Sequence, residues 1–111
     1  MDQDEADERY SRLVGNLVAA RDLLQSAGAG WWSDWLTTVH AEVSAHDAHG
    51  LRRLLGGYGG MGSFNDLVIH PLNGHAVSEA DVGRVNTSLD ALRSALHADA
   101  TALLGDLDRR R

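Results

Sequence analysis

A cluster of glycines constrains this chain more than any other feature of its sequence. Five of the twelve glycines lie between Gly56 and Gly62, and apolar residues follow within a few positions. Glycine costs conformational entropy on folding, and it is the usual residue where a backbone turns sharply or approaches another group closely. Because Phe64 and the run 67–69 favour burial, the segment would make a poor linker. We therefore predict an ordered glycine-rich loop over residues 56–66.

Two interpretations of this loop stay open. In the functional one, its backbone amides form a cradle for an anion or a carboxylate. In the structural one, it is a tight turn capped by Asn65 and Asp66, whose short side chains readily bond nearby backbone. No lysine follows the glycines and no dinucleotide-binding fingerprint is completed, so neither phosphate-binding motif is present. Glycine clusters usually serve geometry, which favours the structural interpretation.

The segments on both sides of the loop have the periodicity of amphipathic helices. Apolar residues recur at steps of three and four over residues 4–27, over the segment that begins at Trp31, and most clearly over residues 78–107. A shorter helix over about residues 51–55 precedes the glycines. We therefore predict a mainly α protein, an antiparallel bundle of three long helices and one short one, in a single domain over residues 1–111.

The segment between the glycine-rich loop and the last helix has the signals of a small β-hairpin. The run Leu67-Val68-Ile69 is β-prone, and Asn73-Gly74 is a strong hairpin-turn dipeptide. Pro71 cannot donate a hydrogen bond to a neighbouring strand, which restricts such a hairpin to an edge. The sequence therefore allows a small hairpin over residues 67–77 that lies on the helices.

The three tryptophans lie within five residues of one another, at Trp31, Trp32 and Trp35. Large aromatic side chains fill the space where helices meet, and tryptophan is also enriched at the energetic centres of protein interfaces. Three rings so close in sequence cannot easily all point inward. We expect Trp32 and Trp35 to be largely buried and Trp31 to be exposed, as a candidate contact residue.

Three potential metal ligands, Glu42, His46 and His49, fall on one helical face. Their spacing matches no zinc signature, and histidines on a polar helix face are usually solvated. We therefore expect no metal site, and no cofactor is implied.

Charge and composition argue against several classes of protein. The chain has 16 acidic residues and 10 basic ones, all arginine, for a net charge of −6. Acidic chains are poor candidates for nucleic-acid binding, and without cysteine there are no disulfides or thiolate metal sites. No apolar run approaches the roughly 18 residues of a membrane span. Because the first residues are acidic, unlike the basic start of a signal peptide, we expect a cytoplasmic protein with no membrane partner.

The loop sequence itself resembles a known family. Residues 59–67 read GGMGSFNDL, and Asn73-Gly74 and a long helix follow. This pattern is similar to a small bacterial family labelled as a domain of unknown function, and the resemblance covers roughly residues 51–104. It implies a cytosolic bacterial domain without an assigned activity, so no catalytic residues are carried over. Size, acidity and lack of cysteine are also similar to the immunity proteins of bacterial toxin systems, by type and not by motif.

These observations favour a protein-binding module, immunity- or inhibitor-like, over an enzyme. Acidic charge would speed its association with a basic partner. The candidate contact residues are Tyr58, Asn65, Asp66 and Trp31. The alternative is a small ligand-binding protein or enzyme that uses the loop amides with Ser63, Asp66 and His70. A homodimer through the helix over residues 78–107 is a third possibility.

Overall fold

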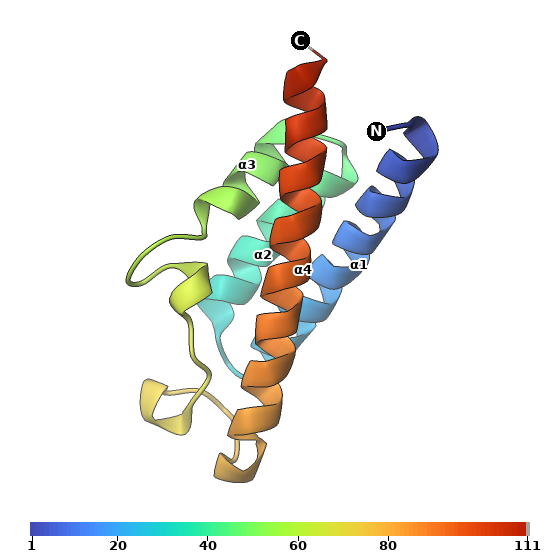
Figure 1. Cartoon of the computed structure of the whole chain (residues 1–111). Helices are drawn as coiled ribbons and strands as arrows, with labels where there is room; N and C mark the ends of the chain where they lie inside the picture. The colour runs from blue at the N-terminus through green and yellow to red at the C-terminus, as the bar shows by residue number, and fades with distance from the viewer. Residues whose placement is uncertain (111) are drawn as a thin grey trace.

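The computed structural model describes residues 1–110 and contains four α-helices (Figure 1). They are α1 (Gln3–Ser26), α2 (Gly30–Ser44), α3 (Ala48–Gly56) and α4 (Val82–Arg109). Between α3 and α4 lie three single-turn 3-10 helices, η1 (Phe64–Asp66), η2 (Pro71–Asn73) and η3 (Glu79–Asp81). The prediction of three long helices and one short one is confirmed. No helix of residues 1–110 combines the length and the apolar character needed to cross a membrane.

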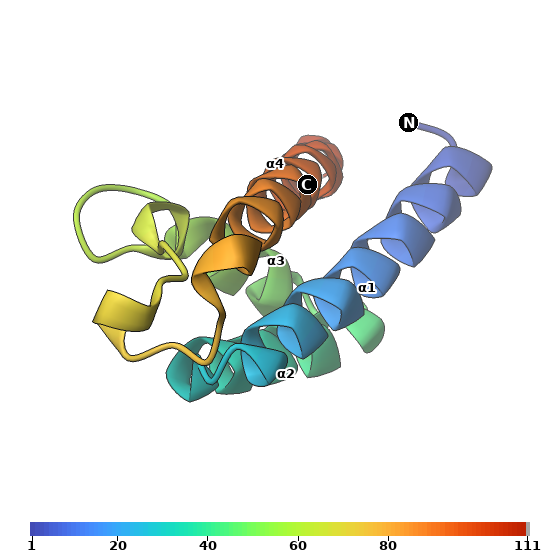
Figure 2. The same cartoon turned by 90° about the horizontal axis from the view of Figure 1, so that it is seen from below.

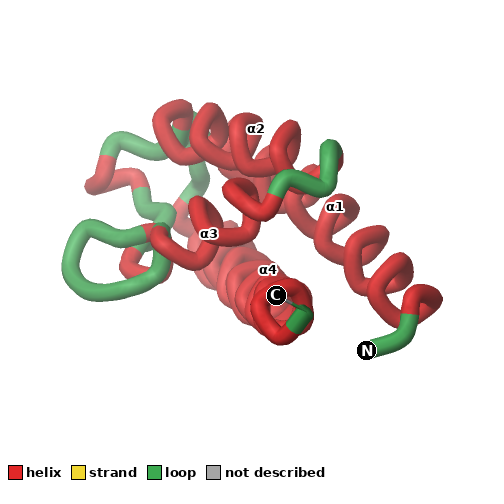
Figure 3. Tube along the Cα trace, turned by 90° about the horizontal axis from the view of Figure 1, so that it is seen from above, coloured by secondary structure: helices red, strands yellow, loops and turns green. Residues whose placement is uncertain are grey.

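The helices form a ring in which each packs on two neighbours, in the order α1, α2, α3, α4 and back to α1. Both ends of the chain lie at one end of the bundle, so α1 and α4 run in opposite directions (Figure 1). The long connection between α3 and α4 descends along one side of the bundle to its other end. Viewed along the bundle, this connection stands out on the side away from the start of α1 (Figures 2 and 3).

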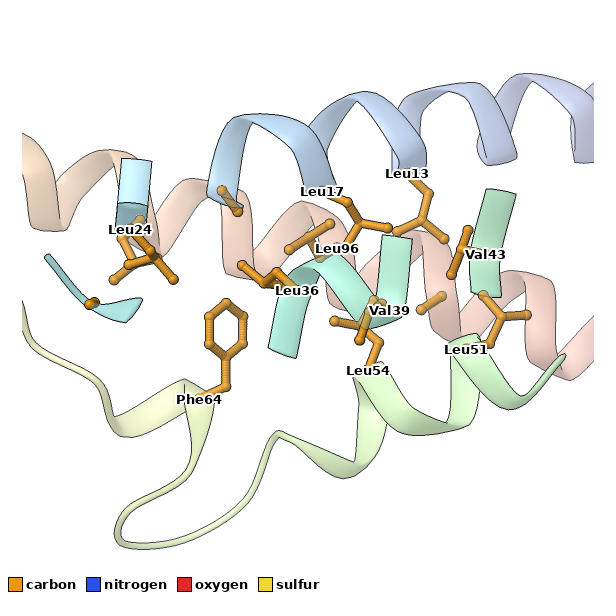
Figure 4. Packing of buried hydrophobic residues seen from close by; sticks show 14 of the residues in the cluster. Leu13, Leu17, Leu24, Leu36, Val39, Val43, Leu51, Leu54, Phe64 and Leu96 are labelled. Carbon is orange, nitrogen blue, oxygen red and sulfur yellow. The ribbon is translucent and has the colours of Figure 1, made fainter. Parts of the chain in front are cut away.

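A single hydrophobic cluster joins the four helices and the connection. Figure 4 shows side chains from all four helices pointing into one core, with Phe64 entering it from the connection near Leu36. Burying a leucine or a phenylalanine stabilises a fold by about 1.5–3 kcal/mol. The helix residues in this cluster that are fully shielded from solvent include Leu13, Leu17, Leu24, Leu36, Val39, Val43, Leu54, Leu89 and Leu96. Because Phe64 and Ile69 are also fully buried, the connection is part of the core.

A buried carboxylate also joins α1 to α4. Asp99 is 5% exposed, and its Oδ1 accepts hydrogen bonds from Arg9 Nη1 at 3.0 Å and from Arg12 Nη2 at 2.9 Å. A buried charge is costly unless it is paired and hydrogen-bonded. The two arginines, which lie outside the apolar stripe of α1, therefore turn toward α4 and neutralise it.

The segment over residues 67–77 does not form the β-hairpin that the sequence allowed. The described part of the chain contains no strand. Asn73 ends the η2 turn, and Gly74 alone of the two takes a left-handed conformation, with φ of 81°, whereas a type I′ hairpin turn needs positive φ at both residues. Backbone pairing is partly replaced by a side chain, because His70 N–H donates to His75 Nδ1 at 3.1 Å.

Gly50 lies at a contact between α3 and α2 that is too close for a side chain at this position. A Cβ atom at Gly50 would lie 2.8 Å from Glu42 Cβ and 2.8 Å from Val43 N. The substitution Gly50→Ala is expected to force the two helices apart and to lower the free energy of unfolding by about 1–3 kcal/mol. Urea or thermal unfolding measures this change.

Gly56→Ala is the matched control on the same helix. No atom lies within 4 Å of a Cβ placed there, so the added methyl should be neutral or stabilise the helix by up to about 1 kcal/mol. Equal destabilisation by the two substitutions would contradict the close contact at Gly50.

Candidate functional site

Phe64 fixes the glycine-rich loop to the bundle. Its side chain is fully buried, and its ring centroid lies 5.2 Å from Trp35, 5.4 Å from Trp32 and 5.7 Å from Tyr58. Aromatic pairs at such distances contribute about 0.5–1.5 kcal/mol beyond their burial. Figure 4 shows Phe64 pointing from the loop into the core. The loop is thus held by a side chain that the bundle encloses.

Gly57 allows the loop to start directly against Trp35. A Cβ atom at Gly57 would lie 2.5 Å from Trp35 Cη2, so a larger residue would have to displace the Trp35 ring. Phe64 N–H donates to Gly57 O at 2.7 Å, which closes the loop on itself. Gly57 therefore has a structural role, because it lets the backbone pass close to the Trp35 ring.

Several of the loop amides are used inside the chain. Gly62 N–H donates to Asp66 Oδ2 at 3.1 Å, and Ser63 N–H donates to Gly60 O at 3.2 Å. In the functional interpretation, the loop amides would bind the carboxylate of a ligand. In the structure, the Asp66 carboxylate binds the Gly62 amide instead. Together with the bond from Phe64, these contacts favour the structural interpretation of the loop.

Arg93 of α4 holds the loop from the other side. Its Nη1 donates to Phe64 O and to Leu67 O, both at 2.8 Å. Its own carbonyl oxygen accepts from Tyr58 Oη at 2.6 Å. Burial raises the pKa of the Tyr58 hydroxyl, against the opposing effect of the Arg93 charge, so the phenol stays protonated and remains a donor. The guanidinium is itself buried, and Asp90 is its ionic partner.

The burial of Arg93 could have been predicted from its position in the sequence. Arg93 lies four residues after Leu89 and three before Leu96, which places it on the apolar stripe of α4. A charged residue at a stripe position indicates a buried ion that needs partners from another element. Those partners are carbonyl groups, which no pattern of side chains reveals.

The predicted site residues are only partly brought together. Ser63 and Asp66 line one hollow, whereas Tyr58 and Asn65 line a second one beside α4. His70 is engaged within its own turn, where its Nδ1 accepts from the N–H of the residue two positions later at 3.0 Å.

Ser63 and His70 do not form a catalytic pair. Ser63 Oγ is buried and has no hydrogen-bond partner among residues 1–110. A serine nucleophile requires a base within hydrogen-bond distance. The histidine that reaches the hollow of Ser63 and Asp66 is His75, which sequence reasoning did not select.

The hollow at Ser63 and Asp66 is small and has walls of mixed character. Its volume is about 330 Å³. It is lined by Trp32, Gly62, Ser63, Asp66, Leu67, Val68, Asn73 and His75. His75 Nδ1 accepts from His70 N–H, so neutral His75 carries its proton on Nε2. The lining therefore combines apolar side chains with one carboxylate, one amide and one imidazole.

The segments that line this hollow also carry exposed apolar side chains. Val68 lines it, and each of the other three is next in the chain to a lining residue. In residues 1–110 the large apolar side chains left exposed are Trp31 (70%), Met61 (99%), Val68 (52%) and Leu72 (90%). We call these four residues and the hollow the loop-end surface. The expected exposure of Trp31 is confirmed, and Trp32 and Trp35 are half-buried.

The chain around the loop-end surface is acidic. Residues 22–35 and 56–83 contain five acidic residues and no lysine or arginine, so they account for nearly all of the net charge of −6. Arg21 and Arg84, at the borders of these segments, pair with two of the five carboxylates. The three without a cationic partner in the described part of the chain are Asp34, Asp66 and Glu79.

The three potential metal ligands do not share one helical face, because α2 ends at Ser44 and His46 lies in the turn before α3, and each has a separate partner. Glu42 binds Arg53 with an N–O distance of 2.5 Å. His46 stacks on Tyr10 with 4.2 Å between ring centroids, and His49 is bonded within its own turn. Among residues 1–110 no three metal-ligating side chains are grouped to hold an ion.

The comparisons with known proteins point to one family. The family model described as Domain of unknown function (DUF6966) matches residues 25–78. The matched segment runs from the end of α1 to just before η3, and it contains all four exposed apolar residues of the loop-end surface. The expected similarity to a domain of unknown function is thus confirmed, over a segment that begins and ends earlier than residues 51–104. No curated protein and no solved structure matches the chain.

Arg93→Met should release the loop from α4. Two carbonyl groups lose a charged donor, so the free energy of unfolding is expected to fall by about 2–3 kcal/mol. Limited proteolysis within residues 57–68 should accelerate. Chemical unfolding and the rate of cleavage measure the two effects.

Arg84→Met is the matched control for Arg93. Arg84 forms an exposed ion pair with Asp81, so its loss should change stability by less than about 0.5 kcal/mol. Similar effects of the two substitutions would show that Arg93 does not hold the loop.

His70→Ala should loosen the η2 turn. The N–H of Leu72 loses its acceptor at His70 Nδ1, and a lost cap of this kind costs about 0.5–2 kcal/mol. His70→Asn should restore it, because asparagine Oδ1 can accept the same bond in an Asx turn. Hydrogen exchange at the Leu72 amide is the measurement, and equally fast exchange in both variants would contradict the capping role.

Proposed function

We propose that the protein is a protein-binding module, of the immunity or inhibitor type, whose loop-end surface docks a basic partner protein. The observation that carries the proposal is that the segments around one hollow hold both the exposed apolar side chains and the carboxylates without a cationic partner, of which Asp66 lines the hollow itself. Soluble proteins rarely leave large apolar side chains together in solvent unless they contact a partner or a ligand. Trp31, 70% exposed, is the residue type most enriched among the side chains that dominate binding energy.

Charge indicates the chemistry of the partner. The two segments that contribute residues to this surface, 22–35 and 56–83, carry only acidic charge, whereas acidic and basic residues nearly balance in the rest of the chain. A one-signed surface attracts partners of the opposite sign and raises the rate of association. It also repels a second copy of itself, which argues against pairing of two copies through this surface.

The family similarity supports the same location. The matched residues, 25–78, include the exposed apolar residues and the hollow but exclude all of α4. A family defined by its core alone would be expected to extend over the longest core helix as well.

The alternative, a ligand-binding protein or enzyme, has one observation in its favour. Ser63 is one of the residues that line the hollow, and its buried Oγ has no hydrogen-bond partner within residues 1–110. The base assigned to it, His70, accepts a backbone hydrogen bond instead. The residues therefore support binding in the hollow more than they support catalysis.

The test is a double variant, Trp31→Ser with Leu72→Ser, compared with the wild type. Both chains are expressed with an affinity tag in the source cells, cross-linked and purified, and the bound proteins are quantified by mass spectrometry. We expect a basic partner that is recovered at about one tenth of the wild-type level or less with the variant, which corresponds to a loss of about 1.4 kcal/mol. Both side chains are largely exposed, so folding should be unaffected.

The control variant is Ala98→Ser with Thr101→Ser on the exposed face of α4. It should recover the partner at the wild-type level. An acidic partner, or equal recovery with the double variant, would overturn the proposal. If light scattering finds that the wild type is a dimer and the double variant is not, the partner at this surface is a second copy of the chain and not a basic protein.

A further inference from the structure

We infer that the hollow of the loop-end surface is a subsite for a single lysine or arginine side chain of the partner. The inference rests on the proposed function and adds the residue that the partner would insert. It follows from the size of the hollow, from its apolar wall and from the single carboxylate in its lining.

The apolar wall suits the stem of a long basic side chain. Trp32, Leu67 and Val68 contribute side chains to the lining, and the volume is about 330 Å³. Lysine and arginine bury their methylene groups along apolar surfaces and keep the charged end beside polar groups. A short cation such as a free ammonium ion would leave this wall unused.

Asp66 provides the charge at the polar side of the hollow. Its Oδ2 accepts from Gly62 N–H at 3.1 Å, which fixes the orientation of the carboxylate. Its Oδ1 has no hydrogen bond within residues 1–110. The nearby guanidinium of Arg93 binds the carbonyl oxygens of Phe64 and Leu67 and forms no ion pair with Asp66. Because an exposed ion pair alone contributes little, the stem and the charge must act together.

Ser63 adds no polar contact to this subsite. The residue lines the hollow, but its Oγ is shielded from solvent and is therefore out of reach of a side chain seated there. An anionic ligand is disfavoured here, because the loop amide of Gly62 is already used by Asp66.

The experiment titrates the full chain with small probes and follows the amide of Gly62 and the indole N–H of Trp32 by NMR. The probes are the Nα-acetyl methylamides of lysine, arginine and norleucine, of which norleucine has an apolar side chain of similar length without the charge. We expect lysine and arginine to bind about three- to fivefold more tightly than norleucine at low salt, and the preference to disappear at high salt.

Asp66→Asn isolates the charge. Asparagine Oδ1 can still accept from Gly62 N–H, so the loop should keep its closure while the preference for the cationic probes is lost. Asp34→Asn removes the same charge from one of the two acidic segments, at a residue that does not line the hollow, and it should keep the preference. Asp66→Glu retains the charge and should keep the preference for cationic probes. It shows whether a loss in Asp66→Asn comes from the missing charge or from misfolding.

Two results would overturn the subsite. Norleucine binding as tightly as lysine would show a purely apolar hollow, and equal losses in Asp34→Asn and Asp66→Asn would show unspecific attraction to the acidic surface. Either result leaves the effect of Trp31→Ser with Leu72→Ser on the partner intact, so the failure of the subsite and the failure of the proposed function are distinguishable.

Discussion

The loop-end surface depends on the buried guanidinium of Arg93. The η1 turn has three residues, too few to satisfy its own carbonyl groups by helical hydrogen bonds. Arg93 Nη1 meets this need by binding the carbonyl oxygens of Phe64 and Leu67, at the first residue of η1 and just after its last. Since Arg93 is in the middle of α4, the longest helix of the bundle holds the segment that carries Ser63 and Asp66.

The glycine-rich loop is ordered by contacts at both its ends. Phe64 occupies a box of aromatic rings, and Gly57 lets the chain pass directly against Trp35. Between these anchors, Asp66 binds the Gly62 amide. The polar groups that sequence reasoning offered to a ligand are thus used in part to shape the loop. What remains available is the outer side of Asp66 and the apolar side chains around it.

Local patterns predicted the helices well and the contacts between distant residues poorly. Helical periodicity is a local property, and it located α1, α2 and α4 from steps of three and four residues. The hairpin signal of Asn73-Gly74 is local too, but Pro71 and the ring nitrogen of His75 led the backbone to a different set of hydrogen bonds. The roles of Arg93 and Asp99 depend on partners 26 to 90 residues away, which no local pattern contains.

An ordered surface with exposed apolar groups has a physical consequence for recognition. Binding costs less conformational entropy when the contact residues are already held in place, and here Phe64 and Arg93 hold them in the free protein. Exposed apolar side chains such as Met61 and Leu72 contribute little to the stability of the isolated fold, because they remain in water. The buried contacts beneath the surface and the exposed side chains on it therefore have different roles: the first set maintains the geometry, and the second is free to contact a partner.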